Sequence, residues 1–250
     1  MHRPARPWWL IAAALLLLAA GLQADQQPRR TLARGPVTVT FPADHSETEA
    51  AAVLDLAVAA WQAIGEKYPL PTPAHVRIDL AATTYAFCRQ TRSPWWLASQ
   101  YRDGIIHLQP VRVLRERGIL TTTLRHEIMH ALLDAATAGN CPRWLSEALA
   151  VFHSGEIEHL KPGRRAAPVT EFSQFETRLA AAQNQEELAA LYFTLYRLAR
   201  FLEEQYGPAK LNSLLRQFQE GKTWPEACLA AWDLPDAEVE RQWRRSIHAE

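Results

Sequence analysis

The segment Thr123–Leu132, TLRHEIMHAL, constrains the fold of this chain more than any other stretch. It contains two histidines four residues apart, with a glutamate directly after the first. Residues at positions i and i+4 of a helix lie on one face, one turn apart. A helix would therefore direct the rings of His126 and His130 to one point. Among the residues that flank the two histidines and Glu127, only Arg125 is charged. We therefore expect Arg125 to face outward from an otherwise buried helix.

This spacing suits a metal ion. Neutral imidazole nitrogens bind zinc at about 2.0–2.1 Å, and two histidines one helical turn apart reach that geometry. Glu127 projects beside such an ion, where its carboxylate can take a proton from a water molecule. The alternative is an ordinary amphipathic helix with two incidental histidines.

Two histidines are too few for a catalytic zinc, which keeps three protein ligands and one open position. A continuation of the HExxHxxGxxH type is excluded, because Leu133 and Ala136 stand where a glycine and a histidine would be needed. Glu147 lies seventeen residues after His130, in the segment CPRWLSEALAVF. A turn at Gly139–Cys141 would bring a second helix back, with this glutamate beside the histidines.

Along the chain, predicted strands precede predicted helices, which favours an α+β class. Alternating β-branched and apolar residues predict strands at 37–41, 75–83 and 104–110. Ser46 and Glu49 predict the start of a helix that continues to about residue 68. We expect 84–103 to be irregular. Further helices are predicted at 111–118, 120–138, 143–153, 171–182, 185–206, 208–219, 223–232 and 236–248.

The N-terminus carries two arginines, an apolar run from Trp8 to about Ala20, and then small residues. This arrangement is typical of a secretory signal peptide, so we expect residues 1–24 to be one, cleaved after Ala24. Residues 25–36 are then expected to be a linker. The expected location is periplasmic or secreted, and the alternative is an inner-membrane protein anchored by the uncleaved segment. No other segment predicts a membrane span.

Charge and cysteine content narrow the choice of partners. The formal net charge is zero, which argues against a nucleic-acid partner. Export would permit a disulfide between Cys88 and Cys141, and three free thiols are the alternative. Cys228 stands in an apolar segment and is expected to be a buried thiol. We expect the cluster of His153, Glu156, Glu158 and His159 to be a solvated loop, and a metal role is the alternative.

The segment TLRHEIMHALLD…CPRWLSEALAVFHSG resembles the gluzincin metallopeptidases, and most closely their peptidase MA-like group. The resemblance covers roughly residues 75–248. It implies a thermolysin-like fold, with a small mixed sheet packed on the active-site helices and a helical C-terminal part. The domain would span 37–250, with an α/β part at 37–118 and a mainly helical part at 119–250. Ala148 departs from the family pattern, which usually has glycine there.

The resemblance also implies roles for individual residues. Zinc ligands would be His126, His130 and Glu147, and Glu127 would be the general base. A tyrosine of a later helix would donate to the oxyanion; Tyr192 matches best, Tyr196 is the alternative, and either could instead be a packing residue. The strand at 104–110 could be the sheet edge that pairs with a peptide, and we expect its His107 to be structural. Trp95 and Trp96 are expected to pack, with a substrate wall as the alternative.

The implied function is that of an exported, zinc-dependent metallopeptidase acting on a peptide or protein substrate. Water activated by zinc would attack the peptide bond, with a glutamate as general base. The alternative is a zinc-stabilised binding or scaffolding protein of the cell envelope that has this fold but little peptidase activity.

Overall fold

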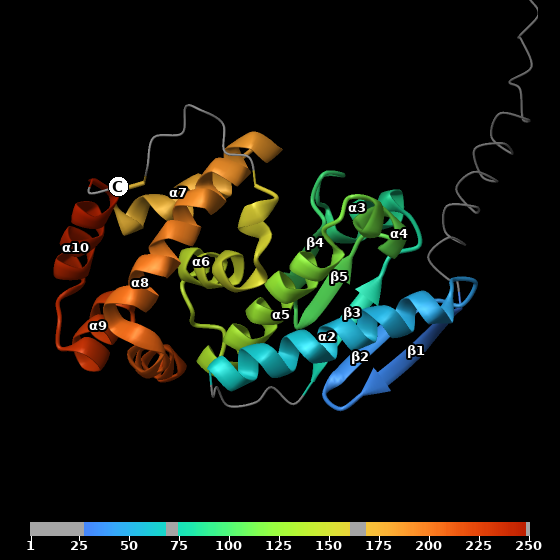
Figure 1. Cartoon of the computed structure of the whole chain (residues 1–250), viewed down its shortest axis with the longest axis horizontal. Coiled ribbons are helices and arrows are strands. Elements are labelled where there is room, and N and C mark those ends of the chain that lie inside the picture. Colours follow the sequence, from blue (N-terminus) through green and yellow to red (C-terminus); the bar gives the residue numbers. More distant parts are fainter. Residues whose placement is uncertain (1–27, 69–74, 161–168, 249–250) are drawn as a thin grey trace, which may run out of the picture.

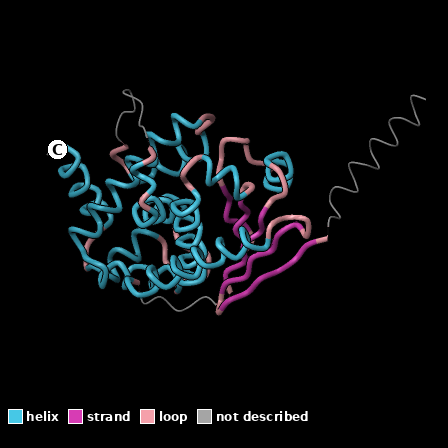
Figure 2. Tube along the Cα trace, turned by 45° about the vertical axis from the view of Figure 1, so that its right-hand side comes forward, coloured by secondary structure: helices cyan, strands magenta, loops and turns pink. Residues whose placement is uncertain are grey.

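The computed structural model describes residues 28–68, 75–160 and 169–248 (Figure 1). A small sheet lies at one side of these residues, and most of the helices lie at the other (Figure 2). The expected signal peptide lies outside the described residues. Within the described ranges, no helix combines the length and apolar character that crossing a membrane requires.

The sheet has five strands in the order β1-β2-β3-β5-β4. These strands are β1 (Arg29–Arg34), β2 (Val37–Pro42), β3 (Val76–Leu80), β4 (Ser99–Arg102) and β5 (Ile105–Leu108). β2, β3 and β5 pair in parallel, whereas β1 and β4 pair antiparallel at the two edges. The small mixed sheet of an α+β fold is therefore confirmed.

The interval that we expected to be a linker contains β1. Its side chains are almost all exposed, so its sequence RRTLAR shows no alternation of apolar and polar residues. What holds it is backbone pairing with β2, together with ion pairs from Arg30 to Glu47 and from Arg34 to Asp55. Charged residues on an edge strand discourage pairing with other molecules, which accounts for this composition.

The interval 84–103, expected to be irregular, contains a helix and the edge strand β4. The helix, α3 (Thr84–Thr91), begins where the Thr83 side chain accepts a hydrogen bond from the amide of Ala86 at 3.0 Å. β4 is polar and short, so it gives no hydrophobic pattern. The sequence does contain a signal for this hairpin, namely the Asp-Gly pair at 103 and 104. These two residues form the tight turn to β5, with positive φ angles of 53° and 72°.

β5 is consequently an inner strand, and the expectation that residues 104–110 form the edge is wrong. The edge strand that contacts α5 is β4. One face of the sheet is apolar and buried, with Val39, Ile78 and Ile106 in register across three strands. The opposite face carries Asp79 and His107, whose Oδ2 and Nδ1 atoms lie 3.6 Å apart.

The helices α2 (Glu47–Lys67) and α5 (Leu120–Thr137) pack together along the apolar face of the sheet (Figure 1). Ser46 caps α2 as expected, accepting from the amide of Glu49 at 3.3 Å. The other helices that follow α3 are α4 (Val111–Glu116), α6 (Arg143–Ser154), α7 (Phe172–Ala181), α8 (Gln185–Gln219), α9 (Trp224–Trp232) and α10 (Asp236–His248). A short 3-10 helix, η2 (Glu156–Glu158), follows α6.

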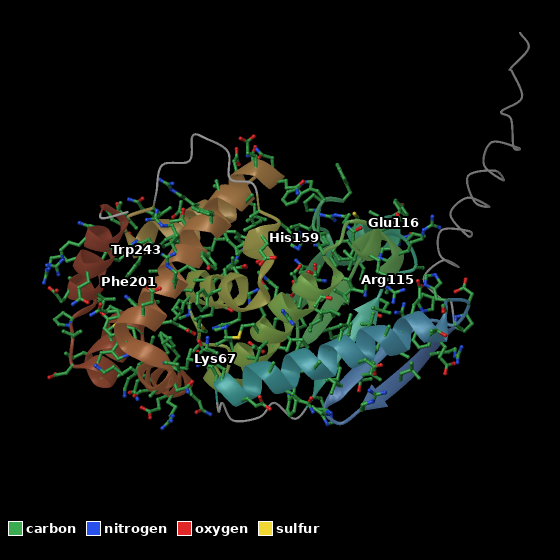
Figure 3. The ribbon with its side chains drawn as sticks, in the orientation of Figure 1. Lys67, Arg115, Glu116, His159, Phe201 and Trp243 are labelled. Carbon is green, nitrogen blue, oxygen red and sulfur yellow. The ribbon has the colours of Figure 1, made fainter. Side chains whose placement is uncertain are left out.

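α8 covers both of the expected helices at 185–206 and 208–219. The break that we predicted is present as a kink, because Gly207 has φ 75° and ψ 165° and Pro208 follows it. The C-terminal helices pack on this long helix through aromatic rings. Figure 3 labels Phe201 of α8 and Trp243 of α10, whose ring centres lie 5.8 Å apart.

Aromatic packing also fixes the orientation of α6. Trp144, in the first turn of this helix, stacks on Phe172 with ring centres 5.1 Å apart and meets Trp224 edge-on at 4.9 Å. Glu147 stands one turn further along α6. The packing of α6 on α7 and α9 therefore sets the direction in which Glu147 approaches α5.

Candidate metal centre

α5 brings His126 and His130 together on its buried face, as the spacing predicted. Their Nε2 atoms lie 3.0 Å apart, and the rings meet edge to face with centres 4.7 Å apart. His126 is only 7% exposed. Arg125 is exposed, as expected for the outward face.

α6 adds a carboxylate to this pair. Oε2 of Glu147 lies 3.5 Å from Nε2 of His126 and 3.7 Å from Nε2 of His130. The connection between the two helices is short, and Gly139 adopts a φ of 77° that favours glycine in the turn. The His–His–Glu grouping that the sequence predicted is thus present.

The three atoms fit a zinc ion. Ligands at about 2.0–2.1 Å from one tetrahedral zinc are roughly 3.3–3.4 Å apart, close to the three separations observed here. Oε2 of Glu147 is buried and accepts no hydrogen bond from the described residues. A buried carboxylate oxygen is stabilised by a partner, and a cation between the three side chains would supply one.

The other nitrogen of each histidine is engaged, which leaves both Nε2 atoms for a metal. Nδ1 of His126 lies 2.7 Å from Oε1 of Glu156, and Nδ1 of His130 lies 2.8 Å from Oγ of Ser146. Such contacts fix the tautomer and orientation of a metal-binding histidine. We expected Glu156 to belong to a solvated loop, and the structure corrects this.

The reason for this correction is a tight turn after α6. Gly155 ends the helix with a φ of 77°, and η2 then turns Glu156 back towards α5. The amide of Glu156 donates to Oγ of Ser154 at 3.2 Å, which holds the turn. His153 does not contact the histidine pair of α5 in this way. Its Nε2 atom lies 2.7 Å from the hydroxyl of Tyr68, at the end of α2.

Glu127 lies beside the triad with its two oxygens in different environments. Oε1 accepts a hydrogen bond from Oγ of Ser99 on β4 at 2.6 Å. Oε2 is buried and accepts no hydrogen bond from the described residues. The carboxylate therefore has one anchored oxygen and one oxygen available for a proton.

Of the two tyrosines considered, only Tyr192 reaches the centre. Its ring stacks on that of His126 with centres 5.8 Å apart. Tyr196 packs instead on Phe152, with centres 5.5 Å apart. A third tyrosine, Tyr101 of β4, was not predicted; it stacks on His130 at 6.5 Å and donates to Oδ2 of Asp134 at 2.8 Å.

The electrostatics of the centre favour a positive charge. Burial lowers the pKa of His126, but Glu156 and Glu147 raise it more, so the pKa lies well above its ordinary value. Burial raises the pKa of Glu147, but His126 and His130 lower it to well below its usual range. Burial and the charges of Glu147 and Glu156 raise the pKa of Tyr192, which keeps its hydroxyl protonated.

Two cavities meet at these residues. One has a volume of about 500 Å³ and extends past Thr122 at the start of α5. The other has a volume of about 640 Å³ and extends past Thr137 at its end. Both are lined by Glu127 and Tyr192, and Trp96 also lines both.

Three further expectations, on the two tryptophans, the disulfide and Cys228, can be compared with the structure. Trp96 lines the cavities, as the substrate-wall alternative required, whereas Trp95 is 73% exposed and does not pack in the core. Cys88 and Cys141 are free, so the structure has the alternative without a disulfide. Cys228 is buried, as predicted.

A His–His–Glu triad beside a buried carboxylate, at the meeting point of two cavities, is the arrangement of a metal-dependent hydrolase. The family model described as the peptidase MA superfamily matches residues 99–249. The chain belongs to the peptidase MA superfamily, as its resemblance predicted, and this supports a peptidase that depends on a metal. No curated protein matches the sequence.

Proposed function

We propose that the protein is a gluzincin-type zinc peptidase with a thermolysin-like active site. The observation that carries this proposal is the pairing of the His126, His130 and Glu147 group with Oε2 of Glu127, which has no partner among the described residues, in one buried centre. A structural zinc site has four protein ligands, whereas three ligands leave a position for water or substrate.

Each residue has a role in this proposal. His126, His130 and Glu147 would hold zinc, which lowers the pKa of a bound water to about 7 and polarises a carbonyl group. Glu127 takes the proton of the attacking water on Oε2 and later delivers it to the nitrogen of the leaving amine. The hydroxyl of Tyr192 donates a hydrogen bond to the carbonyl oxygen as that oxygen gains negative charge.

The substrate would be an extended peptide lying along β4. This strand pairs on one side with β5 and forms the edge of the sheet at the metal centre. An extended peptide adds to such an edge through backbone hydrogen bonds. The cavities continue past both ends of α5, so a chain could extend in both directions from the bond to be cut.

We also propose that the protein is exported. Support comes from residues 1–24, whose arginines, apolar run and small residues have the order of a signal peptide. Cell fractionation with an antibody against the folded domain would test this. Recovery with the cytoplasmic fraction would contradict export, and recovery with membranes would favour the uncleaved anchor.

The first test of the proposed function is the metal content of the purified protein. We expect about one zinc per chain in the wild type and none in His126→Ala, because removal of a ligand leaves too few for tight binding. His75→Ala is the control, since His75 is exposed and outside the site. A folded wild-type protein that stays free of zinc when zinc is offered would contradict the proposal.

The second test is hydrolysis of an unstructured protein such as casein. We expect Glu127→Gln to keep its zinc but lose about 10²–10⁴-fold in turnover, the usual contribution of a general base. Glu116→Gln, which changes an exposed carboxylate of α4, is the control. Zinc binding without any hydrolysis would instead favour the binding or scaffolding protein.

A further inference from the structure

We propose that Ser99 is a positioning residue, whose hydroxyl holds the carboxylate of Glu127 while its backbone is presented to the substrate. This inference rests on the proposed function. It gives the edge strand a second part in the reaction, because one residue would contact both the peptide and the general base.

The first observation is the hydrogen bond itself. Oγ of Ser99 donates to Oε1 of Glu127 at 2.6 Å, a length typical of a hydroxyl bonded to an ionised carboxylate. Glu127 is only 5% exposed, so water has little access to replace this donor. With Oε1 anchored, the carboxylate cannot rotate freely. Oε2, the oxygen without a partner among the described residues, stays in the centre as the proton acceptor.

The second observation is the register of β4. The amide of Gln109 donates to the carbonyl of Ala98 at 3.0 Å, while Ser99 stands opposite Leu108. In an antiparallel pair, hydrogen-bonded and non-hydrogen-bonded residue pairs alternate. Ser99 therefore belongs to a non-hydrogen-bonded pair, and its amide and carbonyl point away from β5 towards the free edge.

These observations together show that the backbone and the side chain of Ser99 point in different directions. The backbone of Ser99 faces the edge where a peptide would add, and its side chain faces α5. Serine combines a short side chain with a hydroxyl donor. Alanine would preserve the strand but leave Oε1 buried without this donor, which destabilises one orientation of the carboxylate relative to others.

The test compares Ser99→Ala and Ser99→Thr with the wild type, each loaded with zinc. We expect Ser99→Ala to keep its zinc and its KM but to lose about 10–100-fold in kcat, because small misplacements of a catalytic group cost up to about 100-fold. Ser99→Thr retains the hydroxyl and should recover most of kcat. A fall in zinc content, or an equal loss in both variants, would show a merely structural role and overturn the proposal.

A second measurement does not depend on turnover. In a crystal structure of zinc-loaded Ser99→Ala, we expect the Glu127 carboxylate to leave its wild-type orientation or to adopt several. An unchanged carboxylate would overturn the proposal. Failure of the proposed function would give a different result. In that case the wild type itself would show no hydrolysis that depends on Glu127.

Discussion

Oε1 of Glu156 lies 2.7 Å from Nδ1 of His126, although the two residues are thirty positions apart in the chain. The contact joins the turn after α6 to the helix that carries both histidines. It fixes which nitrogen of His126 faces Glu147, and this is the orientation that the proposed metal site requires.

This contact predicts the effect of Glu156→Gln on zinc affinity. We expect the affinity to fall by about 10–100-fold, the usual cost of removing a carboxylate that orients a histidine ligand. Competition with a chromophoric chelator would measure it. Glu158→Gln is the matched control, because Glu158 belongs to the same short helix but is exposed. Equal affinities for both variants and the wild type would contradict this role of Glu156.

The two tyrosines of α8 predict different kinetic results. Tyr192 stacks on His126, so Tyr192→Phe should lower kcat by about 10²–10³-fold if its hydroxyl serves the oxyanion. Tyr196 packs on Phe152, so Tyr196→Phe should leave kcat close to the wild-type value. Steady-state kinetics on one peptide substrate would compare them. The reverse order of effects would identify Tyr196 as the donor.

If the proposed site holds zinc, zinc should stabilise the folded protein, because the three proposed ligands come from two helices that separate on unfolding. At a free concentration about 100 times Kd, zinc adds about 2.7 kcal/mol to the free energy of unfolding. For a chain of this length, this corresponds to a rise in Tm of about 5–10 °C. Thermal melting with zinc and then with EDTA would measure the change. His126→Ala should show no rise, and an equal rise in that variant would place the zinc elsewhere.

A second polar cluster predicts a pH dependence of stability that is independent of the metal centre. Glu203 accepts a hydrogen bond from Tyr68 and lies 3.1 Å from Nε2 of His153 and 2.9 Å from Nζ of Lys67, which Figure 3 labels. Burial raises the pKa of Glu203, but these three partners lower it to about 2.

The lowered pKa means that Glu203 stabilises the fold when it is ionised. Its contribution should be complete above the unfolded pKa of about 4.3, and should disappear as the pH falls to about 2. We expect about 1–2 kcal/mol after allowing for partial solvent screening. Urea unfolding of the metal-free protein across this range should show a smaller pH dependence for Glu203→Gln. Glu204→Gln, which changes an exposed neighbour, should match the wild type.

The sequence by itself determined the parts of the site that depend on one helix. His126, Glu127 and His130 occupy the positions that helical geometry dictates, and this is independent of everything around the helix. The position of Glu147 beside the histidines was also predictable, because the short turn between the two helices restricts how the second helix can pack against the first. The break at Gly207 followed from local backbone chemistry in the same way.

Tertiary structure decided the remainder. Glu156 and Ser99 reach the centre from a turn and an edge strand, and their distance from α5 in sequence leaves no periodic signal. Tyr192 and Tyr196 share one helix, so only the packing of α8 on α6 separates their surroundings. β1 and β4 are polar edge strands, which are held by backbone pairing with their neighbours rather than by a hydrophobic pattern. Local spacing therefore specified the proposed ligands and the proposed base, and long-range packing specified the side chains that contact them.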